Sequence, residues 1–239
     1  MSGAPGILYL VPASLGESPW ERTLPAEARQ TACRIQHYVV ENARTARAEL
    51  KRLDHPLPIR DIHIETLPEH PTATQLDALL APALAGESLG LMSEAGCPAV
   101  ADPGALLVAR AHLKGIRVVP LVGPSSLLLA LMASGLNGQS FAFHGYLPVD
   151  EGARNQRLKE LEEESRQGQR TQLFIETPYR NARMFQAVLA TCHPETRLCL
   201  ARDLTTSDEW VRTLRISEWR RAQAPDLAKR PTIFLLQAG

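Results

Sequence analysis

Short apolar runs alternate with longer helix-like segments through the first half of the chain, and this alternation limits the possible folds more than any other feature. Five apolar runs predict strands, at residues 7–11, 36–40, 62–67, 89–92 and 116–121. Three segments between them predict helices, at 43–53, 73–84 and 105–115. Strands that alternate with helices usually form a parallel sheet covered on both faces. The sequence therefore predicts an α/β fold with a mostly parallel sheet.

The pattern changes in the second half of the chain. Helices are predicted at 127–135, 151–169 and 181–192, the second highly charged and solvated. Strands are predicted at 141–147 and 171–176, and the final third is rich in strands, at 197–204, 209–216 and 232–238. We therefore predict two α/β lobes, residues 1–119 and 120–239, hinged near Pro120–Pro124.

Composition and charge exclude several classes of protein. The 239 residues carry a formal net charge of +0, so no global basic field points to a nucleic acid or a membrane. The longest apolar tract, 118–136, is interrupted by proline, glycine and serine, and the N-terminus lacks the pattern of a secretory signal. The four cysteines have neither CxxC nor zinc spacing, so we predict reduced thiols, no metal site and a cytoplasmic protein.

The segment "SEAGCPAVADPG", residues 93–104, is an unusual connection between a strand and a helix. It follows the carboxyl end of the strand at 89–92, which is where ligands bind in open α/β sheets. Gly96 and Gly104 permit backbone conformations closed to other residues, and Asp102-Pro103 suits the start of a helix. On local chemistry alone a well-capped turn is the simpler interpretation. The alternative is the floor of a binding site.

The full string closely resembles the S-D-A-G-T-P-x-x-S-D-P-G loop of the tetrapyrrole methylase superfamily. Within it, the match is to the branch of ribosomal RNA cytidine-2′-O-methyltransferases. Six further segments resemble motifs of that branch in the same order: 8–16, 40–47, 118–126, 141–148, 174–180 and 201–209. Such an ordered series is more specific than any single motif.

This resemblance implies a two-lobed α/β methyltransferase that binds S-adenosylmethionine in the cleft between its lobes. It also implies a homodimer and an RNA substrate, ribosomal RNA above all. The fold differs from the Rossmann-like one, and no GxGxG motif follows the first strand. In the family two loops hold the cofactor largely through backbone groups. The matching residues here are Gly96, Asp102, Pro103, Gly104, Gly123, Ser125 and Ser126.

The chain departs from the family pattern mainly outside the cofactor loops. Ser14 and Glu17 replace a proline and an asparagine, and Asn42 and Ala43 replace an aspartate and a threonine. His144 stands where the branch carries glutamate. Near the C-terminus "KRPTIFLL" (229–236) replaces K-G-E-x-V-L-V. From these changes we infer a divergent paralogue whose methyl acceptor can differ from the ribosomal one.

Methyl transfer from a sulfonium is an in-line displacement, so the protein mainly has to align the reacting atoms. A base is needed only for a poorly acidic acceptor such as a ribose hydroxyl. The candidates are Glu41, Glu176 and His144, but each has a structural alternative. The glutamates can pair with Arg44 or Arg180, and the histidine can be a satisfied core side chain. We therefore assign no catalytic base.

Other motif residues are candidates for binding the acceptor. Arg44, Arg180 and Arg202 match family arginines and can hold an anion by bidentate contacts; internal salt bridges are an equal alternative. Tyr179 can stack on a base, or it can cover a sheet edge.

Three functions remain open from the sequence. The first is a methyltransferase acting on RNA, which the order of the motifs favours. The second is a methyltransferase acting on a small molecule such as a tetrapyrrole. The third is a non-catalytic module that binds S-adenosylmethionine.

Overall fold

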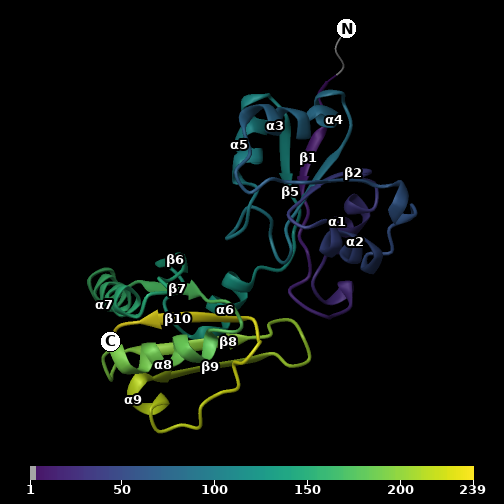
Figure 1. Cartoon of the computed structure of the whole chain (residues 1–239). Coiled ribbons are helices and arrows are strands. Elements are labelled where there is room, and N and C mark those ends of the chain that lie inside the picture. The colour runs from purple at the N-terminus through teal and green to yellow at the C-terminus, as the bar shows by residue number, and fades with distance from the viewer. Residues whose placement is uncertain (1–3) are drawn as a thin grey trace. The chain divides into compact units, whose positions relative to one another are not determined.

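The computed structural model describes residues 4–239, which form two compact units (Figure 1). The first unit ends at Ser125 and the second begins at Ser126. The boundary predicted from the sequence lay at residues 119 and 120. It was placed at the change in strand pattern, whereas the loop that follows the last strand of the first unit still packs within that unit.

The first unit is built on a five-stranded sheet in the order β3-β2-β4-β1-β5. All four pairings are parallel, between β1 (Ile7–Leu10), β2 (His37–Val40), β3 (His63–Thr66), β4 (Leu89–Met92) and β5 (Arg117–Pro120). The central strand β4 is buried along its whole length, as its sequence "LGLM" suggests. The predicted parallel sheet is therefore confirmed for this unit.

Helices cover both faces of this sheet (Figure 1). One hydrophobic cluster contains residues of α1 (Ala26–Ala32) and α2 (Ala43–Arg52). The other contains residues of α3 (Ala73–Leu79), α4 (Ala81–Leu84) and α5 (Ala105–Leu113). Two short 3₁₀ turns complete the unit, Trp20–Arg22 and Ile59–Asp61.

The helix predicted over 73–84 is divided in two. Thr72 and Gln75 form a capping box at the start of α3, and the helix ends at Leu79. A new turn, α4, begins at Ala81 with Pro82 in its first positions. Proline has no backbone N–H to donate to the preceding turn, so it starts a helix more readily than it continues one.

The second unit has a mixed five-stranded sheet in the order β6-β7-β10-β8-β9. Only β6 (Phe141–Tyr146) and β7 (Thr171–Ile175) run parallel. The pairings of β10 (Thr232–Gln237), β8 (Arg197–Arg202) and β9 (Trp210–Arg215) are antiparallel. No helix separates β8 from β9, so the chain returns directly and pairs antiparallel.

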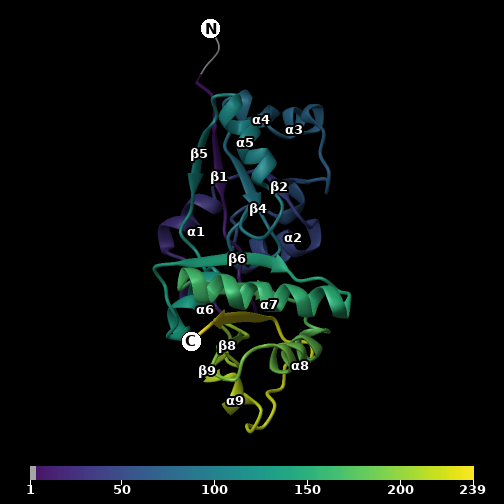
Figure 2. The same ribbon diagram turned by 90° about the vertical axis from the view of Figure 1, so that its left-hand side faces the viewer.

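Four helices cover this second sheet: α6 (Ser126–Ser134), α7 (Glu151–Gly168), α8 (Asn181–Thr191) and α9 (Ile216–Trp219). The core under α7, α8 and α9 contains Phe174, Phe234 and Trp219. Figure 2 shows α7 lengthwise beside β6. The charged helix α7 still buries one face, including Leu158 and Leu161, and ends where Gln169 adopts a left-handed conformation.

Two further observations concern membrane-spanning helices and disulfides. Within residues 4–239, no helix combines the length and the apolar character needed to cross a bilayer. The four cysteines, all in this part of the chain, carry free thiols.

Candidate functional site

Four of the sequence motifs meet at the carboxyl edge of the first sheet. The loop after β1 pairs with the 93–104 loop, because Ala13 and Gly96 exchange N–H···O hydrogen bonds of 2.9 and 3.1 Å. The Glu94 N–H donates to Glu41 Oε2, just after β2, at 3.0 Å. Parallel strands end on one edge of a sheet, which is where such folds bind ligands. Residues distant in sequence therefore form one surface.

A thiol joins this surface to the loop after β5. Cys97 Sγ lies 3.4 Å from the carbonyl oxygen of Pro124 and donates a weak hydrogen bond to it. Ser125, a predicted cofactor residue, follows directly and ends the first unit, and Ser126 begins α6 in the second.

The backbone of the 93–104 loop is strained. Four of its residues have positive φ: Gly96 (71°), Ala99 (65°), Ala101 (65°) and Gly104 (126°). A non-glycine residue in this region costs free energy and persists only where the surroundings enforce it. Such conformations cluster at binding sites, so the strain favours a binding surface over a simple connector.

The predicted cofactor glycines have a packing role in the structure. A Cβ on Gly104 would lie 2.8 Å from Leu91 Cδ2, and one on Gly123 would collide with the ring of Pro12. A Cβ on Gly96 would lie 3.3 Å from Leu15 Cδ2. The missing side chains therefore face protein, and the glycines let the loops pack closely. Their role in holding a cofactor stays a prediction.

Acidic groups give this edge its electrostatic character. Asp102 is half-buried, and burial together with the nearby charge of Glu41 raises its pKa to about 6. The Ser93 hydroxyl opposes this shift, and Glu94 adds to it. Pro103, beside Asp102, is exposed. The edge is therefore suited to a cationic group.

A buried carboxylate that we did not single out from the sequence holds the opening loop. Glu49 is 7% exposed and accepts hydrogen bonds from the Ser14 N–H (3.0 Å), the Ser14 hydroxyl (2.9 Å) and Arg52 Nε (2.9 Å). Ser14 stands where the family has proline, which has no N–H to donate. The serine in place of proline was the only sign in the sequence of this contact. It could not identify Glu49, which lies 35 residues further along the chain.

Another departure from the family pattern is a helix cap. Asn42 Oδ1 accepts from the N–H groups of Arg44 (2.9 Å) and Thr45 (3.4 Å) at the start of α2. Arg44 itself is exposed.

Two candidate residues of the second unit pair with each other. Glu176 lies buried after β7 and accepts from Arg180 through Nη2 (2.7 Å) and Nε (3.0 Å). This is the ion pair considered as the structural alternative for both residues. Tyr179, between them, is 80% exposed and is free to take part in stacking.

His144 has partners at both ring nitrogens. Its Nε2 lies 2.6 Å from Gln172 Oε1, and its Nδ1 lies 3.3 Å from Arg157 Nη2. An arginine can only donate, so Nδ1 accepts and Nε2 carries the proton. The geometry thus agrees with a structural role for His144.

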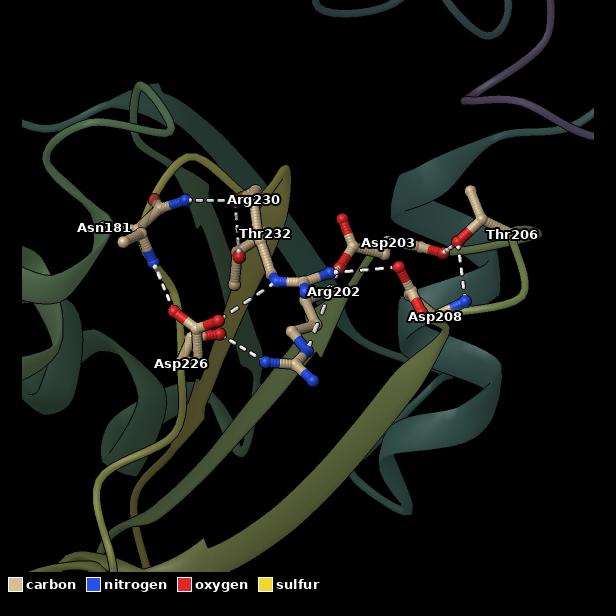
Figure 3. A network of polar contacts seen from close by, with 9 residues as sticks. Asn181, Arg202, Asp203, Thr206, Asp208, Asp226, Arg230 and Thr232 are labelled. Carbon is tan, nitrogen blue, oxygen red and sulfur yellow. Dashed lines mark hydrogen bonds and ion pairs between the residues drawn. The ribbon is translucent and has the colours of Figure 1, made fainter.

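Arg202 belongs to a polar network that joins two loops (Figure 3). Its guanidinium lies over the Trp210 ring, 5.2 Å from the centroid, and donates to the Asp226 carbonyl. Arg230, at the centre of the network, pairs with three carboxylates: Asp203 (2.7 Å), Asp208 (3.4 Å) and Asp226 (3.4 Å). These contacts raise the pKa of Arg230 above its usual value. Both arginines are thus engaged within the fold.

Similarity to known proteins decides the family. The chain matches no protein-family model. Over 91% of its length it is 32% identical to the ribosomal RNA small subunit methyltransferase I of Vibrio cholerae, of which it covers 71%. Over 87% of its length it is 35% identical to the protein of the same name from Xylella fastidiosa, again covering 71% of that relative. The chain belongs to the ribosomal RNA small subunit methyltransferase I family.

As a member of this family the chain is a methyltransferase, an enzyme class that needs a methyl donor. Its fold resembles the crystal structure of the methyltransferase CobJ, with a TM-score of 0.64 and 17% identity over 98% of this chain and 95% of that one. At that identity the likeness concerns the fold alone. The predicted tetrapyrrole methylase fold is thereby confirmed.

The family pattern also makes sense of Arg230. This residue stands where the ribosomal RNA methyltransferase pattern has glycine, and Pro231 stands where it has glutamate. The large side chain of Arg230 is accommodated because Asp203, Asp208 and Asp226 surround it. Arg230 therefore adds a central residue to this polar network.

Proposed function

We propose that this protein transfers a methyl group from S-adenosylmethionine to RNA, and that the acceptor is a ribose 2′-hydroxyl of ribosomal RNA. The observation that carries the proposal is the assembly of four family motifs on one sheet edge in the first unit. The names of the relatives support ribosomal RNA as the acceptor class.

The cofactor would be held at this edge by Gly96, Asp102, Pro103, Gly104, Gly123 and Ser125, and the family motif adds Ser126, the next residue along the chain. S-adenosylmethionine supplies an activated methyl group on a positively charged sulfonium. The residues present fit such a group, because Glu41, Glu94 and Asp102 make the edge acidic. The strained 93–104 backbone also offers polar main-chain groups there.

The chain's own contribution is alignment. The Ala13–Gly96 hydrogen bonds and the Glu41–Glu94 contact fix the loops relative to one another, and the Glu49 anchor fixes the opening loop. Holding the acceptor in line with the methyl carbon removes most of the entropic barrier.

A tritium transfer assay tests the proposal. Labelled S-adenosylmethionine is incubated with the protein and, in parallel, with undermethylated small ribosomal subunits, bulk tRNA or uroporphyrinogen. We expect label in the ribosomal RNA, at sites resistant to alkaline cleavage of the backbone because the 2′-oxygen is blocked. Label only in the porphyrin fraction would contradict an RNA acceptor, and cofactor binding without transfer to any acceptor would contradict an active enzyme.

We also propose a homodimer that works in the cytoplasm, where ribosomal subunits mature. Helix α6 is apolar on nearly every side and leaves Leu128 (51%) and Met132 (80%) exposed one turn apart. A second copy that covers these side chains would remove apolar surface from water. Light scattering at micromolar concentration should give twice the 26.3 kDa chain mass. A monomeric mass would count against the dimer.

A further inference from the structure

The first turns of α7 and α8 lie together at the end of β7 and enclose a small cavity. It is lined by Val149, Arg154, Glu176, Arg180, Arg183 and Met184. The cavity measures about 10 Å³, which is room for a single water molecule or one oxygen atom of a larger group. Three of the lining residues are arginines.

Arg154 is the unusual member of this set. It is only 5% exposed, and one of its Nη atoms donates to the Val149 carbonyl at 3.2 Å. Its buried Nε–H has no hydrogen-bond partner among the residues that the structure describes. A buried charged donor without an acceptor is costly. The chain itself therefore satisfies the Arg154 guanidinium only in part.

The other groups around the cavity also attract an anion. The N-cap residue of α8, Arg180, makes no side-chain hydrogen bond to the first N–H groups of the helix, and the positive end of the helix dipole lies there. Arg183 has a side chain that is 60% exposed and a weak ion pair with Glu151, at 3.4 Å. Arg180 is held against the cavity by Glu176.

The balance of charge in the cavity lining is positive. Among the lining residues three arginines face one carboxylate, Glu176. Two further carboxylates lie at the start of α7: Glu151, which is exposed and loosely paired with Arg183, and Asp150, which caps the helix. Tyr179, 80% exposed, precedes Arg180 directly. An exposed aromatic ring beside an arginine cluster is the combination that binds single-stranded nucleic acid, through base stacking and phosphate contacts.

We propose that this cluster binds a phosphate group of the RNA backbone. One phosphate oxygen would enter the cavity beside the Arg154 guanidinium, while the others meet Arg183 and the first N–H groups of α8. The adjacent nucleotide base would stack on Tyr179. The inference rests on the proposed RNA acceptor and assigns it a contact site in the second unit.

The test is the salt dependence of RNA binding, measured by fluorescence anisotropy with a short labelled single-stranded RNA. Each phosphate contact contributes about 0.7 to the slope of log Kobs against log[KCl] for a single strand. We expect Arg183→Ala to lower the slope by about one contact and to weaken binding several-fold at low salt. Arg154→Lys, which keeps the charge but lacks the guanidinium fork, should weaken binding similarly with a smaller change in slope.

Arg166→Ala is the matched control. Arg166 is also an exposed helix arginine of the second unit paired with a glutamate, Glu163, but it lies in the last turn of α7. Its loss should leave the slope unchanged. Conversely, Glu151→Gln removes the carboxylate that competes with phosphate for Arg183, and it should strengthen binding. Affinity for S-adenosylmethionine should be the same in all four variants.

Two outcomes would overturn the inference in distinguishable ways. If the wild-type protein neither binds nor methylates RNA, the proposed function and this site fail together. If the wild type methylates RNA but Arg183→Ala and Arg166→Ala give the same slope, the phosphate site alone is wrong. Because Arg183 is exposed, its variant does not depend on the tolerance of the buried Arg154 position to substitution.

Discussion

The carboxyl group of Asp102 shows how the surroundings of one residue set its response to pH. Burial and the charge of Glu41 raise its pKa from 3.8 to about 6. The folded protein therefore binds a proton that the unfolded chain releases at lower pH. The contribution of this group to stability is complete below about pH 4 and is lost as the pH rises to about 6.

We predict that Asp102→Asn removes this pH dependence. Between pH 4 and pH 7 the variant should gain about 1 kcal/mol in unfolding free energy relative to the wild type, a value reduced because half of the carboxyl is solvated. Urea denaturation at both pH values measures the difference. Asp61→Asn, at an exposed residue paired with Arg60, is the control. A difference that does not vary with pH would contradict the shifted pKa.

A second prediction at this scale concerns Glu49. Glu49→Ala leaves the Ser14 N–H and the Arg52 guanidinium without their acceptor in a partly buried place. We expect a loss of about 3 kcal/mol in unfolding free energy, typical of a broken buried charge pair. Removing Glu195, which pairs with Arg215 at the surface, should cost less than about 0.5 kcal/mol. Equal costs would show that Glu49 is not an anchor.

At the scale of elements, the strands were predicted within one or two residues because they are short apolar or alternating segments between turn-forming residues. Helix α1 was missed, since "AEARQTA" buries only Ala28 and Ala32 and shows no apolar period. Four candidate site segments were found through motifs. Glu49 was not found, because its partner Ser14 is 35 residues away in the sequence and is brought close only by the fold. Arg154 was not found, because what distinguishes it is a buried Nε without a partner, which no sequence pattern reveals.

The glycines at the two ends of α5 test whether close packing explains the glycine at position 104. Gly104 begins this helix with a φ of 126°, and a Cβ there would meet Leu91. Gly115 follows it with a φ of 70° and has open space around it. We expect Gly104→Ala to cost about 2–3 kcal/mol, and Gly115→Ala about 1 kcal/mol from the backbone conformation alone.

Gly138→Ala completes the series, since that glycine has neither a positive φ nor a neighbour within 4 Å of the added atom. It should be neutral. Thermal denaturation of the three variants gives the order. If Gly104→Ala is as mild as Gly138→Ala, close packing does not explain the glycine at the start of α5.

At the scale of the whole molecule, the two units contain independent sheets. Every strand of the first sheet lies within residues 7–120, whereas the second sheet draws on residues 141–237. The sequence predicted two lobes from the change in strand pattern. It did not reveal that β10 lies in the middle of the second sheet, because strand order depends on contacts between distant segments.

We predict that ending the chain at Arg230, and so removing β10, unfolds the second unit and spares the first. Trp219, which is 2% exposed, should then emit like a solvated indole. A protease-resistant fragment ending near Ser125 should persist. Loss of that fragment, or native emission from Trp219, would contradict separate stability of the two units.

The central place of β10 also has a consequence for biosynthesis. While the polypeptide emerges from the ribosome, the first unit has all of its strands once residue 120 is exposed and can fold early. The second must wait for residue 237, and until then β7 and β8 present open edges with no strand between them. Slow translation or a premature stop in this interval exposes these edges to aggregation, so the nascent second half is where chaperones have most to protect.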